Sequence, residues 1–156
     1  MKLCIAAVGR LRPGPEASLV ADYSARAEGV GRRLGIGPFR LCEIDDRKAR
    51  TAAAQGKALL EACQAGSLRV ALDERGRSLG SDAFADLLAD QRDGGRAEIA
   101  FLIGGADGHG DSLRAQADQL LSLGPMVWPH MLVRVMVAEQ IYRALSILAG
   151  TPYHRA

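Results

Sequence analysis

The stretch IAFLIGG, residues Ile99–Gly105, indicates the fold of this chain. Its leading residues are all apolar and lack the alternation of polar and apolar positions that a half-exposed strand shows. Both faces of this strand are therefore expected to be buried, and Gly104 and Gly105 end it abruptly. A strand covered on both sides is typical of a parallel sheet with helices above and below it.

The rest of the chain repeats this order of an apolar run followed by a helical pattern. Further strands are predicted at Leu3–Val8, Phe39–Ile44, Leu68–Leu72 and Met126–Trp128, with a polar turn at Asp73–Gly76. Helices are predicted at Glu16–Leu34, Arg47–Ala65, Ser81–Arg92 (Ser81 as its cap), Asp111–Leu121 and Pro129–Ala149. The sequence thus predicts an α/β fold with a mainly parallel sheet and helices on both faces. No linker or repeat divides it, so residues 1–156 are expected to form a single domain.

Composition limits what this protein can be. The chain has 156 residues, 48% of them hydrophobic and 24% charged, which is typical of a globular domain and not of a disordered chain. Its net charge is only +2, although 17 of its 20 basic residues are Arg. A charge this low does not predict a protein that holds free nucleic acid mainly by electrostatic attraction. Aromatic residues make up 4%, so aromatic stacking is not expected to be its main means of binding.

The cysteines and the N-terminal run favour a reducing compartment. Cys4, Cys42 and Cys63 match neither a disulfide framework nor a metal-ligand spacing, so free thiols and no bound metal are expected. The first apolar run, Leu3–Val8, is too short for a signal peptide or a membrane span. We therefore expect a cytoplasmic protein with no membrane partner.

Three stretches fall where a parallel α/β sheet binds its ligands, just beyond the carboxyl ends of strands. They are Leu72-Asp73, Gly104–Gly108 and Leu123–Trp128. Gly104 would let a ligand approach the backbone closely, and the proline-bounded loop after Leu123 could line an adenine pocket or could instead be a core strand. Neither a G-x-G-x-x-G fingerprint nor a P-loop is present, so the pattern fits an adenosine held by backbone amides and apolar walls.

The final predicted helix, Pro129–Ala149, is apolar over much of its circumference. So wide an apolar surface predicts burial against the sheet and also against a partner, for which a second copy of the chain is the simplest candidate. Glu139 and Arg143 are four residues apart, in the order that favours an ion pair. A solvated, paired face is the other interpretation of these two residues.

The last residues of the chain concentrate chemistry-bearing side chains, because Tyr153, His154 and Arg155 follow one another. Terminal residues usually fray, and the tail would then have no role. However, Pro152 stiffens the approach, and His is the side chain most easily poised for proton transfer near neutral pH. The other two histidines are scattered and do not predict a metal site.

Together, these motifs resemble the ribosomal RNA large subunit methyltransferase H family, which belongs to the SPOUT class of methyltransferases. The similarity runs nearly from end to end, and the combination is specific although no single motif is. Its markers are Leu3–Gly9, Phe101–Gly105 with Gly108, Leu121–Leu123, Pro129-His130 with Leu132–Val135, Glu139–Ala144 and Pro152–Arg155. The chain departs from the family pattern at His109, where relatives usually carry an apolar residue, in the Pro- and Gly-rich loop Arg10–Pro15, and at Ala156.

The resemblance implies a C-terminal deep trefoil knot and a homodimer. It also implies transfer of a methyl group from S-adenosyl-L-methionine to N3 of a pseudouridine in 23S ribosomal RNA, on the assembled large subunit or the whole ribosome. By matching position, the implied cofactor contacts are Leu72, Gly104, Leu123, Gly124, Pro125, Met126, Val127 and Trp128. These residues fall on the three strand ends described above.

The imide N3 must lose its proton to attack a methyl group, so a base within hydrogen-bond reach is expected. We expect His154 to deprotonate or orient the nucleobase at the cofactor pocket of either subunit, with Tyr153 and Arg155 holding the base or a phosphate. Glu139 is the second candidate base, although pairing with Arg143 would make it a poor one. Contacts to the RNA backbone are expected from Arg10, Arg12, Arg134 and Arg143.

Two other functions remain open from the sequence. The chain could be a SPOUT methyltransferase that modifies another RNA, or a non-catalytic ribosome-associated module that only holds a nucleotide. A flavodoxin-like protein is disfavoured because phosphate-loop chemistry is missing.

Overall fold

The computed structural model describes residues 1–154 and contains a five-stranded sheet with the strand order β2-β1-β4-β3-β5. The strands are β1 (Lys2–Val8), β2 (Phe39–Ile44), β3 (Leu68–Ser78), β4 (Glu98–Ile103) and β5 (Gln119–Ser122). Every neighbouring pair is parallel. The α/β fold with a parallel sheet is therefore confirmed.

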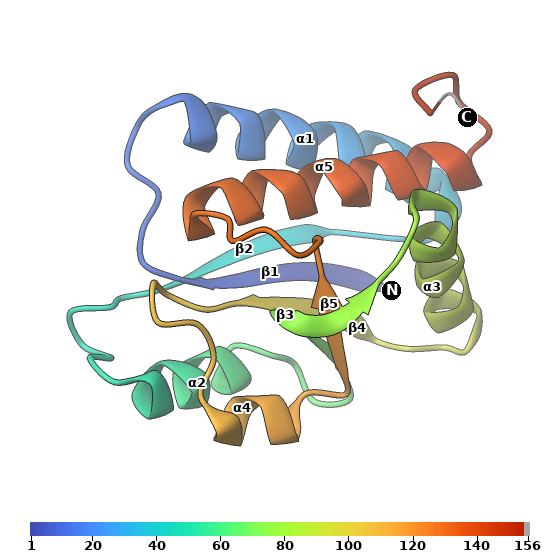
Figure 1. Ribbon diagram of the computed structural model, residues 1–156. Helices are drawn as coiled ribbons and strands as arrows, with labels where there is room; N and C mark the ends of the chain where they lie inside the picture. The colour runs from blue at the N-terminus through green and yellow to red at the C-terminus, as the bar shows by residue number, and fades with distance from the viewer. Residues whose placement is uncertain (155–156) are drawn as a thin grey trace.

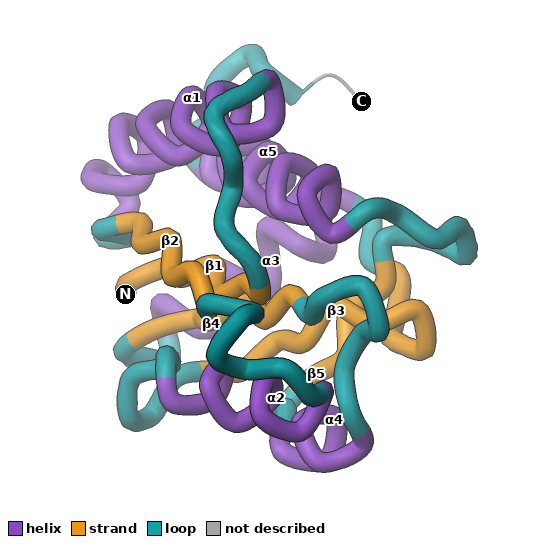
Figure 2. The backbone as a smooth tube through the Cα atoms, turned by 90° about the vertical axis from the view of Figure 1, so that its left-hand side faces the viewer, coloured by secondary structure: helices purple, strands orange, loops and turns teal. Residues whose placement is uncertain are grey.

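Helices cover both faces of the sheet, with α1, α3 and α5 on one side and α2 and α4 on the other (Figure 1). The helices are α1 (Pro15–Gly31), the short 3₁₀ helix η1 (Arg32–Leu34), α2 (Ala52–Glu61), α3 (Ser81–Asp93), α4 (Asp111–Gln116) and α5 (His130–Leu148). The loops after the strands gather at the edge of the sheet where the carboxyl ends meet, which Figure 2 views directly.

Successive residues of β1 face the two helical layers in turn. Leu3 and Ile5 join the apolar cluster shared with α1, α3 and α5. Cys4 and Ala6 join a second cluster with Leu59 of α2. Because side chains alternate across a strand, a strand covered on both sides has to be apolar at every position, which explains the runs without alternation.

The fifth strand is not the predicted Met126–Trp128 but β5, and the predicted helix Asp111–Leu121 ends as α4 at Gln116. Leu120 and Leu121 pair with β3 in parallel. Met126 and Val127 instead lie in a loop with 68% and 86% of their surfaces exposed. The prediction failed because apolar character was taken as a sign of a core strand, whereas these residues are displayed on the surface.

The predicted turn at Asp73–Gly76 is also wrong, because β3 continues through it to Ser78. The pairing of β3 with β5 shifts register between Leu72 and Arg77, so this stretch bulges. A Cβ atom on Gly76 would lie 2.5 Å from the backbone of Leu120, and only glycine allows so close an approach. The polar residues Asp73–Gly76 therefore belong to strand β3 and not to a turn.

Two helix starts differ from the prediction. α2 begins at Ala52, not Arg47, because Thr51 is the N-cap and its hydroxyl accepts a hydrogen bond from the amide of Ala54. Ser81 is the first residue of α3 and not its cap, since its hydroxyl donates to Oε1 of Gln140 on α5. Ser81 thus ties α3 to α5.

The three cysteines are free thiols, and burial raises the pKa of the Cys4 thiol to about 12. Within residues 1–154, no group of three or more His, Cys, Asp or Glu side chains is arranged to hold a metal ion. In the same residues, no helix combines the length and the apolar character that crossing a membrane requires.

Candidate functional site

A cavity of about 330 Å³ opens at the carboxyl ends of β3, β4 and β5. Its volume lies within the roughly 300–1,000 Å³ range of small-molecule pockets. It brings together all three strand ends that the sequence singled out. The predicted cofactor residues that line it are Leu72, Gly104, Leu123, Gly124, Met126, Val127 and Trp128. Pro125 is not among the lining residues.

The glycines of the turn after β4 line the cavity together with Ala106, Asp107 and His109. A Cβ atom on Gly104 would lie 2.9 Å from the carbonyl carbon and oxygen of Gly108 and 3.2 Å from Nδ1 of His109. Gly108 has a φ of +69°, which side chains other than glycine rarely adopt. Glycine at these two positions therefore lets the turn fold tightly back on itself beside the cavity.

Charged residues gather at one end of the cavity, and of these the sequence had singled out only Asp73. Asp73, Glu74 and Arg75 line it from the extended part of β3, and Arg114 lines it from α4. The Asp73 side chain is only 6% exposed, and its Oδ2 lies 3.5 Å from Nη1 of Arg114. The available signal was the run of charges directly after the Leu68–Leu72 strand, which the sequence predicted to be a polar turn.

His109 is a second residue whose position the sequence did not reveal. Its ring is buried at 6% exposure, and Nε2 lies 3.1 Å from the carbonyl oxygen of Leu102. Burial lowers the pKa of His109, which favours a neutral ring at neutral pH. A neutral ring meeting a carbonyl oxygen has to place its proton on Nε2 and donate it there. His109 thus fastens the glycine turn to β4.

The cavity suits a positively charged nucleoside cofactor. The apolar wall from Leu123 to Trp128 can cover an adenine ring, and the glycine turn presents main-chain polar groups. The carboxylates of Asp73, Glu74 and Asp107 can accept from amines and hydroxyls. By contrast, no phosphate-cradling loop is present in the sequence. The residues present therefore fit S-adenosyl-L-methionine.

The tail packs against the second half of α5 (Figure 1). The Tyr153 hydroxyl donates to Oε1 of Glu139 at 3.0 Å, and the same oxygen accepts from Nε and Nη2 of Arg143 at 3.0 and 2.6 Å. The Tyr153 ring lies 4.4 Å from the ring of Tyr142, and the Arg143 guanidinium lies 4.9 Å from the Tyr153 ring centroid. Desolvation, followed by hydrogen bonds with Tyr23 and Glu139, raises the pKa of Tyr153. The predicted Glu139–Arg143 ion pair is confirmed, and it holds the tail.

His154 lies beside Arg143 and far from the cavity of its own chain. Its Nδ1 is 3.4 Å from Nη1 of Arg143, and its Nε2 is 3.8 Å from Asp82 on α3. Arg143 is thirteen residues along α5 from His130, which lines the cavity, a separation of about 20 Å at the helical rise per residue. This chain therefore does not bring its tail to its own cavity. Arg155 lies outside the described residues.

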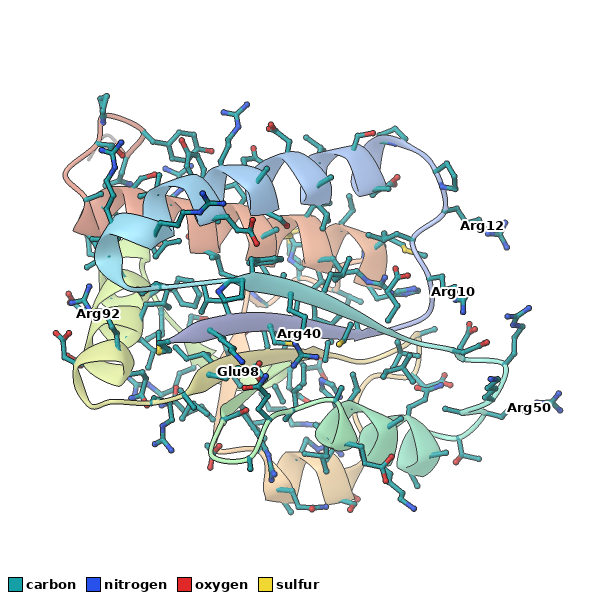
Figure 3. All side chains as sticks on the ribbon, turned by 180° about the vertical axis from the view of Figure 1, so that it is seen from behind. Arg10, Arg12, Arg40, Arg50, Arg92 and Glu98 are labelled. Carbon is teal, nitrogen blue, oxygen red and sulfur yellow. The ribbon has the colours of Figure 1, made fainter. Side chains whose placement is uncertain are left out.

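The predicted RNA contacts divide into two kinds. Arg10 and Arg12 are exposed and point away from the body of the protein (Figure 3). Arg134 is 0% exposed, with its guanidinium on Glu43 and on the carbonyl oxygens of Val8 and Gly9. The expectation that Arg134 contacts RNA is therefore corrected, because its donors hold together the carboxyl ends of β1 and β2.

A parallel sheet with a cofactor cavity at its strand ends agrees with the comparison against protein families. The model of the family described as "Predicted SPOUT methyltransferase" matches residues 1–154. The class of this protein is therefore that of the SPOUT methyltransferases. The chain is 56% identical over 155 residues to ribosomal RNA large subunit methyltransferase H of Dinoroseobacter shibae, and 57% identical to that of Cereibacter sphaeroides, with 99% of each chain covered. The protein of the same name from Ruegeria pomeroyi is 56% identical to this chain over the same length. This chain belongs to the ribosomal RNA large subunit methyltransferase H family.

Proposed function

We propose that this protein transfers a methyl group from S-adenosyl-L-methionine to N3 of a pseudouridine in 23S ribosomal RNA. Full-length similarity to ribosomal RNA large subunit methyltransferases H carries this proposal. The cavity at the strand ends supports it, because the cavity fits the methyl donor. The substrate is the assembled large subunit or the whole ribosome, since a net charge of +2 suits a protein that recognises a preformed surface. Such a substrate places the enzyme in the cytoplasm.

When bound, the cofactor supplies an electrophilic methyl group on a positively charged sulfur. The residues that would hold it are the cavity residues Leu72, Gly104 and the loop Leu123–Trp128, with Pro125 shaping the loop from outside the lining. The glycine turn positions the nucleoside by its main chain, and the apolar loop excludes water from it. Holding the two reactants in line is expected to supply much of the acceleration.

The enzyme acts as a homodimer, and its C-terminal part forms the deep trefoil knot of its family. The surface of α5 supports the dimer, because Leu132 is exposed and Val135 and Met136 are only partly buried. This apolar stripe runs from the cavity end of the helix towards Glu139, where the tail is held. A two-fold dimer brings the same patch of each subunit together. If the two α5 helices cross in opposite directions, the tail of one subunit meets the cavity of the other.

The tail acts on the nucleobase across this dimer. Tyr153, His154 and Arg155 hold and orient the base, with His154 as the expected proton acceptor or orienting group. His154 is held at Arg143, which lies thirteen residues and about 20 Å along α5 from the cavity residue His130, and this separation supports action in the partner subunit. Glu139 positions the tail and does not act as the base, because its Oε1 already accepts from Tyr153 and Arg143.

Exposed arginines dock the RNA next to the cavity. Arg10 and Arg12 lie on the loop that follows β1, whose carboxyl end borders the site. Contacts to phosphates release counterions, so affinity for the ribosome should fall as salt rises. Arg143 contributes through the tail that it holds, and its pairing with Glu139 leaves it less free for phosphates.

The decisive experiment measures methyl transfer from labelled S-adenosyl-L-methionine to ribosomes and to naked RNA side by side, followed by mass mapping of the modified nucleotide. A methyl group at N3 of a 23S pseudouridine, with ribosomes preferred, is the expected result. Methylation of a different RNA would favour another SPOUT activity. Cofactor binding without any transfer would favour a ribosome-associated binding module.

A further inference from the structure

The first residue of α5, His130, combines an exposed edge with a place at the cofactor cavity. Its imidazole lines the cavity and is half-buried. Among residues 1–154, no group forms a hydrogen bond with this ring. Nε2 lies 3.8 Å from the position that a Cβ of Gly9 would occupy, so the ring borders the carboxyl end of β1 as well. An imidazole with unused nitrogens beside a cofactor cavity is available to a substrate.

Two charged groups face His130, and together with burial they set its protonation. Arg134 approaches from the next turn of α5, and Asp46 approaches from the loop after β2. Glu43 of β2 neutralises part of the Arg134 charge. Burial, followed by Arg134, lowers the pKa of His130 more than Asp46 raises it. The partial positive charge at the N-terminus of α5 also disfavours the imidazolium, so the ring keeps a free lone pair at neutral pH.

The other two histidines are already engaged. His109 is buried and uses Nε2 on the carbonyl oxygen of Leu102. His154 has Nδ1 at Nη1 of Arg143 and Nε2 near Asp82. The His154 ring is held in place by the Arg143 guanidinium, so it is well suited to orient a nucleobase. Both ring nitrogens of His154 thus already face protein groups, whereas among residues 1–154 neither ring nitrogen of His130 has a hydrogen-bond partner.

The loop that would bring the RNA begins beside His130. Gly9 is followed directly by Arg10, and Arg12 lies two residues further on, both pointing away from the body of the protein (Figure 3). Phosphates held by this loop would lie at the mouth of the cavity, on the side where His130 borders it. A nucleobase that enters between the RNA-docking loop and the cofactor cavity passes the His130 ring.

We infer that His130 is the proton acceptor for N3 of the pseudouridine, and that His154 of the partner subunit orients the base. This inference rests on the proposed function. N3 gives its proton to a ring nitrogen of His130 while its electron pair forms the bond to the methyl carbon. The electron pair of the broken carbon–sulfur bond stays on sulfur, which leaves S-adenosylhomocysteine. The imidazolium then releases the proton to water.

Single-turnover methylation of ribosomes by His130→Ala, compared with His154→Ala, tests this role. His130→Ala should be slower by about 10²- to 10⁴-fold at pH 7, the usual contribution of a positioned base. The wild-type rate should level off with rising pH once His130 is neutral, whereas the His130→Ala rate should keep rising as hydroxide removes the N3 proton. Added imidazole should partly restore His130→Ala and should leave His154→Ala unchanged.

Two further readouts separate this role from a structural one. Cofactor binding, followed by the fluorescence of Trp128 at the cavity, should change by less than about 3-fold in His130→Ala, because the ring is assigned to the nucleobase. Circular dichroism should show a folded protein, and His130→Gln, which keeps polarity but has no basic nitrogen, should behave like His130→Ala. Three results would each overturn the inference. The first is a His130→Ala pH profile that matches the wild-type profile, and the second is a loss of cofactor binding in His130→Ala. The third is imidazole that restores His154→Ala and not His130→Ala. If the wild-type protein itself does not methylate a 23S pseudouridine, the proposed function fails first.

Discussion

The two ends of α5 differ in what they leave open. At the start of the helix, His130 borders a cavity, and Met126 and Val127 of the preceding loop are mostly exposed. At its end, the side chains of Glu139, Arg143 and Tyr153 are bound to one another. The start of the helix therefore borders a cavity, whereas the tail is already bound to side chains of α5. The difference teaches that the cavity and the tail lie at separate places along α5, which is the observation behind the proposed action of the tail across a dimer.

Mixing two inactive variants gives the largest expected effect and could break this comparison. Gly104→Val should close the cavity, and His154→Ala should remove the orienting group, so each homodimer should be nearly inactive. In an equal mixture that has exchanged subunits, half of the dimers are hybrid and each hybrid has one complete site, so about a quarter of wild-type activity should return. Activity is measured by methyl transfer to ribosomes. If mixing restores nothing, the tail does not act across the dimer.

Two arginines on the same helix should differ strongly in their effect on folding. Arg134→Met should lower the free energy of unfolding by about 3 kcal/mol, because it leaves buried carbonyl oxygens and Glu43 without their donor. Arg143→Met should cost less than about 1 kcal/mol, because its ion pair with Glu139 is partly solvated. Urea unfolding measures both. Equal losses would mean that the tail is as integral to the fold as the ends of β1 and β2.

Adding one methyl group, by a Gly→Ala substitution, should affect cofactor binding at the cavity but not elsewhere in the molecule. Gly104→Ala should weaken cofactor binding by about 10- to 100-fold, the equivalent of the roughly 1–3 kcal/mol that overpacking costs. The added Cβ would lie 2.9 Å from the backbone of Gly108. Gly29→Ala in α1, where nothing lies within 4 Å, is the matched control and should leave binding unchanged. Titration followed by Trp128 fluorescence measures both variants, and unaffected binding in Gly104→Ala would remove the glycine turn from the site.

The smallest expected effect concerns acid pH at the cavity end. Burial lowers the pKa of His109 in the folded protein, so the unfolded chain takes up this proton at higher pH. Stability is therefore complete above the unfolded pKa of about 6.5 and falls as the pH drops below it. Unfolding free energies at pH 7.5 and 5.5 should differ less for His109→Leu than for the wild-type protein. An equal difference would mean that folding does not lower the pKa of His109.

Sequence reasoning succeeded where one local signal was enough. The apolar runs located β1 and β4 because strands buried on both faces have to be apolar throughout, and a run interrupted by Arg40 and Glu43 located the less buried edge strand β2. The strand-end rule also located the cavity, since parallel strands bring their carboxyl ends to one edge. The prediction of a fifth strand failed because apolar residues can also lie exposed in a loop. Met126–Trp128 is as apolar as a core strand but lies at the surface, and hydrophobicity alone does not distinguish burial in one chain from burial against another.

The charged residues were misjudged for a similar reason. Arg134 and Arg143 are both Arg among apolar residues of one helix, and nothing in their spacing shows that one is buried at 0% exposure and the other is partly exposed. Burial of a guanidinium depends on acceptors that lie far away in sequence. For Arg134 these acceptors are Glu43 and the carbonyl oxygens of Val8 and Gly9. The sequence lists such partners but does not bring them together.

The sequence by itself determined the α/β class, the order of strands and helices along the chain, the edge of the sheet where the cavity opens, and the family. These properties follow from local patterns of burial and from motifs of specific residues. Only the tertiary structure decided that β3 runs on past Asp73, that His109 and Arg134 are internal supports, and that the tail is held at Glu139 and Arg143 and not at the cavity. Such facts depend on contacts between residues distant in sequence, which exist only once the chain has folded.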